Sequence, residues 1–309
     1  MTRTLVLGEA LLPAAAALGL EVVADHPDLV LLDLSDPGAV AAAAGTHPMV
    51  PRVVIADPTQ AALLGALGRG AFEIMTSAEP AAIGPLITRL APPRPRGATR
   101  LVLVTGVAGG CGRTLLAVNL ALRLGTRGSV ALIDLTGSGG AAWWLRVGSA
   151  PWDEIEGVAL ELTPEHLAVI ASQRDSIRVI GGAGSMPSAE LGLAATRASL
   201  ALCDLVVVDA PPLRDERTRA IAALADRVLV LVADDPASRA QLAAIDKDGH
   251  WVLASRSQPD EIAGHSVVRS FPDDAAALRA AAGGDGMVGG ALGRAYDDLA
   301  ELLAIDATE

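Results

Sequence analysis

The sequence predicts an α/β protein of two domains, in which short apolar strands alternate with alanine- and leucine-rich helices. Its 309 residues are 51% hydrophobic and 19% charged, which is enough apolar material for two cores and excludes a globally disordered chain. The segment 91–97, APPRPRG, has the composition of a stiff linker. Several runs after it are continuously apolar, as strands buried on both faces of a parallel sheet are.

Residues 1–91 form the first predicted domain, and residues 92–98 link it to the second. Four apolar runs in this part predict strands, and Ala/Leu-rich stretches between them predict helices. The expected strands are 4–7, 30–32, 53–56 and 72–75. The pattern indicates a small α/β unit.

Residues 99–309 form the second predicted domain, a doubly wound and mainly parallel sheet. Its strand candidates are mostly separated by helical stretches, as β-α-β units require. The expected strands are 101–105, 130–134, 177–181, 205–209, 227–232, 251–255 and 267–270.

Composition excludes several classes of function. No apolar run approaches the roughly 18 residues of a membrane span, and the start MTRTLVLGEA lacks the order of a secretory signal, so we expect an intracellular, cytoplasmic protein. Two cysteines, Cys111 and Cys203, are too few for a disulfide framework or a zinc site. The net charge of −12 argues against a nucleic-acid partner.

The first strand of the second domain leads into a glycine-rich loop, Gly106 to Thr114, and then an apolar helix. Glycines let backbone N–H groups converge on an anion, and the helix N-terminus adds its positive end. The Thr114 hydroxyl is a candidate Mg²⁺ ligand. We expect Cys111 within this loop to be a small filler, the alternative being a thiol made redox-sensitive by the helix end.

This arrangement resembles the deviant Walker A ATPases of the ParA/MinD family, whose loop runs K-G-G-x-G-K-T. Asp134 and Asp209, each at the end of an apolar strand, support the resemblance, which covers 99–309. It implies a SIMIBI-type P-loop domain that binds ATP and Mg²⁺. The implied nucleotide-binding residues are Gly109, Gly110, Cys111, Gly112, Arg113, Thr114 and Asp209; the implied Mg²⁺ ligands are Thr114 and Asp209; the catalytic candidates are Arg113 and Asp134.

Four departures from the family pattern weaken the expected chemistry. The two loop lysines fall on Ala108 and Arg113, and the only lysine in the chain is Lys247. The family's second acid is Thr136, and its adenine-reading asparagine falls near Ser255. Because phosphoryl transfer depends on positioning and charge stabilisation, we expect ATP hydrolysis to be weak or absent.

The first domain resembles a degenerate receiver domain of response regulators. Asp33 stands at the phosphoacceptor position, but Glu9 lacks its acidic partner and Ser77 occupies the place of the lysine. Phosphorylation of Asp33 is therefore not expected, and a solvent-facing acid is the simpler interpretation. A degenerate receiver before a deviant P-loop is the domain order of CpaE-like and TadZ proteins.

Three tryptophans follow the predicted strand 130–134, namely Trp143, Trp144 and Trp152. Their pattern resembles that of actinobacterial CpaE-like proteins, some of which are named septum-site-determining proteins. They predict either a dimer or partner surface, or a tryptophan core under a loop. The glycine-rich stretch 284–289 fits G-x-G-x-x-G but opens no β-α-β unit, so we expect a turn. The last helix, 291–305, is amphipathic but acidic, which predicts packing on the domain rather than a membrane anchor.

Together these features predict a spatial organiser of the CpaE/TadZ/MinD type, a homodimer among its expected states. Its expected partners are proteins of a division, pilus or secretion machinery, which would recruit it to a pole, a septum or the inner face of the membrane. The first alternative is a slow ATPase that dimerises on ATP, with Arg113 replacing the lysine. The second is a dinucleotide enzyme with Asp134 on the ribose, which the GGCGRT loop disfavours.

Overall fold

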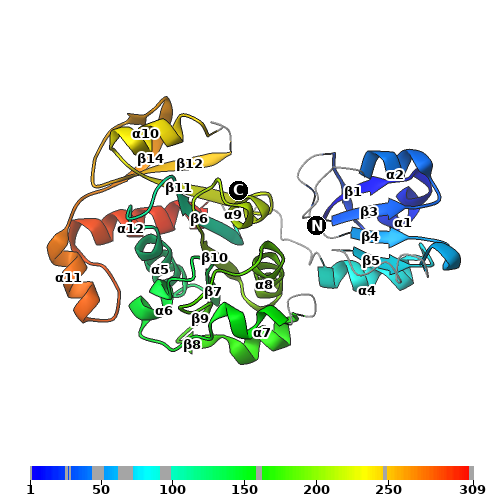
Figure 1. Cartoon of the computed structure of the whole chain (residues 1–309), viewed down its shortest axis with the longest axis horizontal. Helices are drawn as coiled ribbons and strands as arrows, with labels where there is room; N and C mark the ends of the chain where they lie inside the picture. Colours follow the sequence, from blue (N-terminus) through cyan, green and yellow to red (C-terminus); the bar gives the residue numbers. More distant parts are fainter. Residues whose placement is uncertain are drawn as a thin grey trace. The chain divides into compact units, whose positions relative to one another are not determined.

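The structure of the chain is a computed structural model. It describes residues 2–24, 27, 29–43, 52–61, 72–90, 99–157, 162–245 and 249–305. The chain divides into two compact units, Met1–Arg96 and Gly97–Glu309 (Figure 1). The predicted linker, 92–98, lies outside the described residues.

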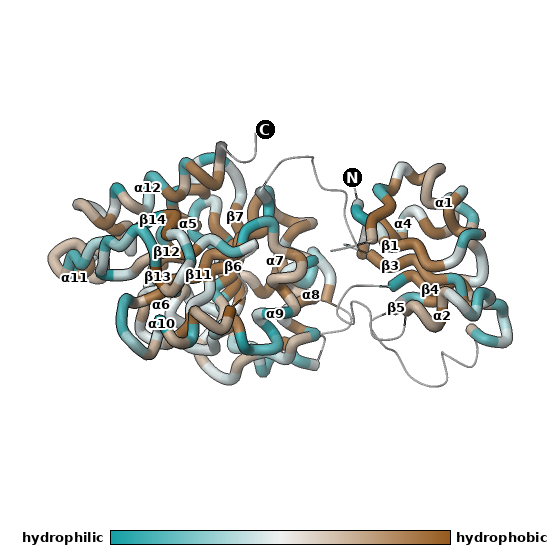
Figure 2. The backbone as a smooth tube through the Cα atoms, turned by 90° about the horizontal axis from the view of Figure 1, so that it is seen from above, coloured by the Kyte–Doolittle hydropathy of each residue, from teal (hydrophilic) through white to brown (hydrophobic). Residues whose placement is uncertain are grey.

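The first unit is built on a parallel five-stranded sheet in the order β2-β1-β3-β4-β5, an order that doubly wound α/β folds use. All four predicted strands are present. The sheet contains β1 (Arg3–Leu7), β2 (Glu21–Val22), β3 (Leu29–Asp33), β4 (Arg52–Ile55) and β5 (Phe72–Met75). The helices include η1 (Glu9–Leu11), α1 (Leu12–Ala17), α2 (Pro37–Ala43) and α4 (Pro80–Leu90). Strand β3 is buried throughout, and Figure 2 shows it and β1 as strongly apolar.

The second unit contains a nine-stranded sheet in the order β13-β14-β12-β11-β6-β10-β7-β9-β8. The inner strands are parallel, and the short edge strands β13 and β8 run antiparallel to their neighbours. The strands are β6 (Leu101–Gly106), β7 (Val130–Asp134), β8 (Ser172–Arg174), β9 (Ile177–Ile180), β10 (Leu205–Asp209), β11 (Arg227–Ala233), β12 (His250–Ser255), β13 (Glu261–Ile262) and β14 (His265–Phe271). All seven predicted strands are therefore confirmed.

Helices cover both faces of this sheet. They are α5 (Arg113–Leu124), α6 (Gly140–Leu145), η2 (Trp152–Glu154), α7 (Pro164–Ile170), α8 (Ala189–Leu202), α9 (Glu216–Ala222), α10 (Pro236–Leu242), α11 (Ala275–Gly283) and α12 (Gly290–Ile305). Val102 and Val104 of β6 belong to the core cluster with α5 and α12, whereas the alternating Leu101 and Leu103 are buried on the other face. Figure 1 shows α8 and α9 on the face away from α5.

The predicted packing of the last helix is confirmed. Tyr296, Leu299 and Leu303 of α12 are buried in the core cluster that α5 dominates. Arg123, near the end of α5, is the main polar tie between the two helices, because it donates to Asp297 at 2.6 Å and to the carbonyl oxygens of Val288 and Gly293. The glycine-rich stretch 284–289 is the turn between α11 and α12, as predicted. Among the described residues no helix is long and apolar enough to cross a membrane.

The topology fixes where a site can form. Strand β6 lies between β10 and β11, while the chain leaves β6 through α5 and continues into β7 on the far side of β10. Such a reversal of winding direction opens a crevice at the carboxyl ends of the strands, which is where doubly wound sheets bind ligands. The glycine loop, Asp134 and Asp209 all follow or end strands at this edge.

Candidate functional site

The loop from Gly106 to Gly112 joins the central strand β6 to α5 and requires glycine at defined points. Gly110 and Gly112 have φ of 75° and 98°, a region that other L-residues rarely adopt. A Cβ on Gly106 would lie 2.8 Å from the carbonyl oxygen of Leu231 on the neighbouring strand β11. Anion-binding nests are built from alternating left- and right-handed residues, and Gly110 and Gly112 supply two left-handed positions on either side of Cys111.

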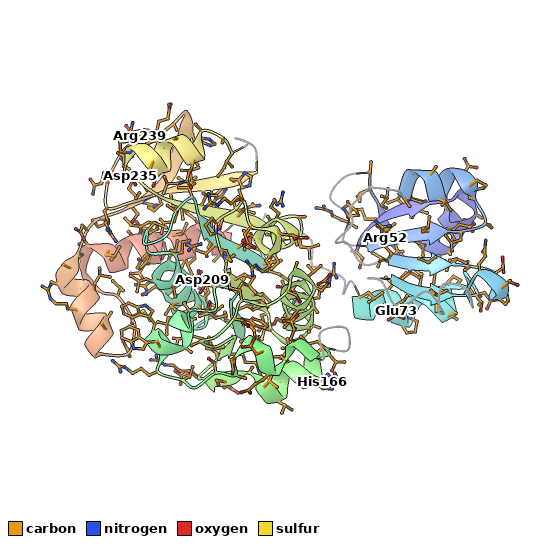
Figure 3. All side chains as sticks on the ribbon, in the orientation of Figure 1. Arg52, Glu73, His166, Asp209, Asp235 and Arg239 are labelled. Atoms are coloured by element: carbon orange, nitrogen blue, oxygen red, sulfur yellow. The ribbon has the colours of Figure 1, made fainter. Side chains whose placement is uncertain are left out.

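Two carboxylates stand side by side below this loop. Asp209 and Asp134 are register partners at the ends of the adjacent strands β10 and β7, and both are fully buried. Thr114, the second residue of α5, donates its hydroxyl to Asp209 Oδ2 at 2.6 Å. Figure 3 shows the labelled Asp209 in the interior of the second unit. Thr114 and Asp209, which the sequence predicts to share one site, are therefore in direct contact in the fold.

The pKa of Asp209 is raised to about 7, chiefly because the side chain is buried and also because the charge of Asp134 lies next to it. The hydrogen bond from Thr114 and the charge of Arg113 act in the opposite direction. Asp209 Oδ1 is buried without a hydrogen-bond partner. An orphaned carboxylate oxygen of this kind favours either a proton or a cation next to it.

The donor set fits Mg²⁺. This ion takes hard oxygen ligands and keeps several waters when it bridges a protein to phosphates. Asp209 supplies a carboxylate oxygen without a partner, and Thr114 supplies a hydroxyl at the start of the helix. Among the described residues, no group of three or more His, Cys, Asp or Glu side chains is placed to hold a metal, so Mg²⁺ at this site would depend on Asp209, Thr114 and oxygens of the nucleotide and water.

Asp134 differs from Asp209, because both of its carboxylate oxygens already accept hydrogen bonds. Oδ1 accepts hydrogen bonds from the Thr136 N–H at 2.9 Å and from its hydroxyl at 2.6 Å, and Oδ2 accepts from the Ala141 N–H at 3.3 Å. The Thr136 hydroxyl also lies 2.7 Å from that of Ser138. Asp134 thus anchors the segment that joins β7 to α6. A catalytic role for Asp134 stays a prediction.

Arg113 lies across the base of the loop. Its guanidinium donates to the carbonyl oxygen of Ala210 at 2.6 Å, just beyond β10, and its Cδ would lie 2.9 Å from a Cβ at Gly106. The planar guanidinium is thereby held by the protein backbone, whereas an ammonium on a flexible stem could follow a phosphate. The role of Arg113 in binding or catalysis stays a prediction.

Cys111 fills space. It is buried, its thiol lies 3.4 Å from the carbonyl oxygen of Ala108, and burial raises its pKa. A raised pKa disfavours the reactive thiolate, so the filler interpretation accounts for the geometry. Cys203 is also buried, as predicted.

The tryptophans differ in their burial. Trp152 is fully buried and donates its indole N–H to the carbonyl oxygen of Asp134 at 2.7 Å, so it supports the strand that carries the carboxylate. Trp143 on α6 is 59% exposed and stacks edge-on against Trp144, with ring centroids 4.9 Å apart. Gly140, at the start of the same helix, allows close approach to Thr114, because a Cβ there would lie 2.9 Å from Thr114 Cγ2.

Two residues that the sequence analysis did not place at the loop contact it directly. Ser255, at the end of β12, donates its hydroxyl to the carbonyl oxygen of Cys111 at 2.8 Å. Arg256 follows with a φ of 61° and donates to the carbonyl oxygen of Gly110 at 3.0 Å. The family pattern marks Ser255 only as the place of a lost base contact, and no feature of the sequence predicts that Arg256 adopts a left-handed backbone.

In the first unit, the prediction that Asp33 faces solvent is wrong. The residue is 8% exposed, and its Oδ1 accepts hydrogen bonds from the backbone and the hydroxyl of Ser35 at 2.9 and 2.7 Å. Gly8 packs against it, since a Cβ at Gly8 would lie 2.6 Å from Asp33 Cβ. The loop after β1 therefore packs against the end of β3.

Comparison with known proteins adds to this geometry. No family model matches the chain. It is similar to the maintenance of carboxysome distribution protein A of Gloeobacter kilaueensis, with 31% identity over 151 residues. That match spans 49% of this chain and 56% of the relative, so the chain covers little more than half of the curated protein it resembles.

Solved structures match over about two thirds of the chain. A ParA family ATPase from Chlorobium tepidum aligns with a TM-score of 0.58 at 14% identity, covering 66% of this chain and 99% of that one. The chain has the ParA/MinD P-loop fold. The MinC:MinD cell division complex of Aquifex aeolicus aligns at 0.52 and 16% identity, covering 66% and 95%. The septum site-determining protein MinD of Pyrococcus horikoshii, complexed with Mg-ADP, aligns at 0.52 and 16%, covering 68% and 100%.

Proposed function

We propose that this chain is a spatial organiser that binds a magnesium nucleoside triphosphate, by preference ATP, and recruits protein partners while hydrolysing the nucleotide slowly or not at all. Its output is then the location of the partners rather than turnover. The observation that carries the proposal is the contact between Thr114 and Asp209 beneath a loop whose glycines remain and whose lysines are gone.

Binding is supported by parts of the site that need no lysine. The loop offers backbone N–H groups, and the start of α5 adds its positive end. Thr114 and Asp209 would hold Mg²⁺ through oxygen atoms. When bound, Mg²⁺ would neutralise charge on the β- and γ-phosphates. These contributions favour a bound triphosphate in its ground state.

Slow hydrolysis follows from what the site lacks. Catalysis needs groups that stabilise the transition state more than the bound substrate. The chain has no lysine in the loop, Thr136 replaces a water-orienting acid, and the Arg113 guanidinium is engaged by the Ala210 carbonyl. Removal of one such group costs roughly two to three orders of magnitude in rate.

The partners we propose are proteins of a positioning machinery. The relatives named above include a carboxysome distribution protein and a MinD bound to MinC. The exposed Trp143, on the helix that begins beside Thr114, is our candidate contact for a partner or a second copy. We further propose the CpaE-like/TadZ branch, with pilus, secretion or septum positioning, from the receiver-like motif around Asp33.

Binding is tested by titrating Mg-ATP into the purified chain by calorimetry. We expect a saturable signal that EDTA abolishes and that Thr114→Ala weakens at least tenfold. Thr126→Ala is the matched control, because Thr126 lies past the other end of α5 and its hydroxyl, among the described residues, bonds only the Arg123 carbonyl. No saturable signal from the unmodified chain, or equal effects of the two variants, would reject the proposal.

The alternative is a slow ATPase that uses Arg113 in place of the lysine. Phosphate release separates the two functions. We expect release close to background and little change in Arg113→Ala. Arg127→Ala, an exposed arginine after α5, is the control. Release well above background that disappears in Arg113→Ala but persists in Arg127→Ala would favour the ATPase.

A further inference from the structure

We propose that Ser255 and Arg256, at the end of β12, form a clamp that sets the direction of the phosphate-binding N–H groups in the glycine loop. The two side chains hold two consecutive carbonyl oxygens, those of Cys111 and Gly110, at 2.8 and 3.0 Å. The inference deepens the proposed nucleotide binding and rests on it.

Peptide geometry connects the clamp to the site. In a trans peptide the C=O of one residue and the N–H of the next point in opposite directions. The Gly110 and Cys111 carbonyls are drawn toward β12, so the N–H groups of Cys111 and Gly112 point to the opposite side of the loop. Neither N–H donates to a backbone oxygen among the described residues. They are therefore two donors available to an anion, directed by bonds on their far side.

The backbone of Arg256 is consistent with this role. Its φ of 61° is costly for a residue with a side chain, by about 1 kcal/mol, and persists only where the surroundings require it. The left-handed turn carries the chain away from β12 while the guanidinium reaches the Gly110 carbonyl. Within the described residues this is the only hydrogen bond that the side chain makes, and the residue is exposed.

The two clamp residues act on the loop in different ways. Ser255 is 7% exposed, carries no charge and contributes its single proton to Cys111. It can therefore act on a phosphate only through the loop. Arg256 adds a positive charge at the rim of the loop as well as a hydrogen bond. A loop without its lysines depends more on these backbone donors, because no flexible ammonium can compensate for a misdirected N–H.

The test compares Mg-ATPγS with inorganic triphosphate, which has no base, by calorimetry on the full chain. We expect Ser255→Ala and Arg256→Ala each to weaken both ligands about three- to tenfold, the effect of one hydrogen bond. Arg256→Lys should restore affinity to within about twofold. Arg279→Ala, an exposed arginine on α11, should match the unmodified chain. The unliganded melting temperature of Arg256→Ala should stay unchanged.

Several outcomes would overturn the clamp. If Ser255→Ala weakens ATPγS but not inorganic triphosphate, Ser255 reads the base. If Arg256→Ala weakens both ligands while Ser255→Ala does not, the guanidinium binds phosphate directly. If both clamp variants match the unmodified chain while Thr114→Ala loses affinity, the clamp fails and the proposed function stands. If the unmodified chain binds neither ligand, both fail.

Discussion

The buried carboxyl of Asp209 should make the unliganded chain less stable as the pH rises from about 4 to about 7. Its ordinary pKa is 3.8 and its pKa in the folded chain is about 7, because burial and the charge of Asp134 disfavour ionisation. The folded state thus binds the proton more tightly than the unfolded state. The stability that this proton contributes is fully present below pH 3.8 and is lost as the pH passes 7.

The magnitude follows from the same two values. A pKa raised from 3.8 to about 7 corresponds to about 4 kcal/mol between the two protonation states. Asp209→Asn cannot ionise and keeps an oxygen that can accept the Thr114 hydroxyl. Relative to the unmodified chain, the unfolding free energy of Asp209→Asn should therefore rise by up to about 4 kcal/mol between pH 4 and pH 8.

Urea unfolding at half-unit pH steps, without nucleotide or Mg²⁺, measures this difference. Asp204→Asn is the control of opposite sign, because its carboxylate accepts two hydrogen bonds from Ser129 that lower its pKa. Its substitution should cost stability at neutral pH and progressively less as the pH falls below the ordinary value. A difference between Asp209→Asn and the unmodified chain that stays constant from pH 4 to pH 8 would refute the reasoning.

Two further substitutions test how the site is supported. Gly106→Ala should destabilise the chain by about 1–3 kcal/mol, since its Cβ would lie 2.8 Å from a carbonyl oxygen of β11. Gly109→Ala is the control, because a Cβ there meets nothing within 4 Å. Equal denaturation midpoints for the two variants would contradict the packing described. Trp152→Phe should lower the free energy of unfolding by about 1–3 kcal/mol, because it leaves the Asp134 carbonyl without its indole donor. Trp143→Phe, at an exposed position, should change it by less than about 0.5 kcal/mol. The reverse order of the two effects in thermal melts would contradict the buried and exposed roles described for these tryptophans.

The strands that the sequence predicted are those whose patterns are strong. Strands such as β6, β7 and β10 are five or six residues long and begin with four consecutive apolar residues, so their burial in a parallel sheet is visible in the sequence. Strands β2, β8 and β13 have two or three residues and lie at sheet edges, where little burial leaves no periodic signal. They were missed for that reason.

The site was predictable to the extent that it is local. The loop and Thr114 are contiguous, and Asp209 ends an apolar strand, so motif and strand pattern together place them at one edge. The contacts of Ser255 and Arg256 with the loop span 144 and 146 positions, and an arginine gives no sign of a left-handed backbone. The burial of Asp33 likewise depends on Gly8 in the loop after β1. The sequence around Asp33 gives no sign of this contact.

The most direct test of the account is the chemical state of the nucleotide that the chain retains. The chain is equilibrated with Mg-ATP, separated rapidly from free nucleotide, denatured, and the released nucleotide is identified by chromatography. We predict about one intact ATP per chain, and a large loss of retention in Thr114→Ala. Retained ADP with stoichiometric phosphate, formed within minutes, would contradict a site that binds without rapid cleavage, and no retained nucleotide would contradict binding itself.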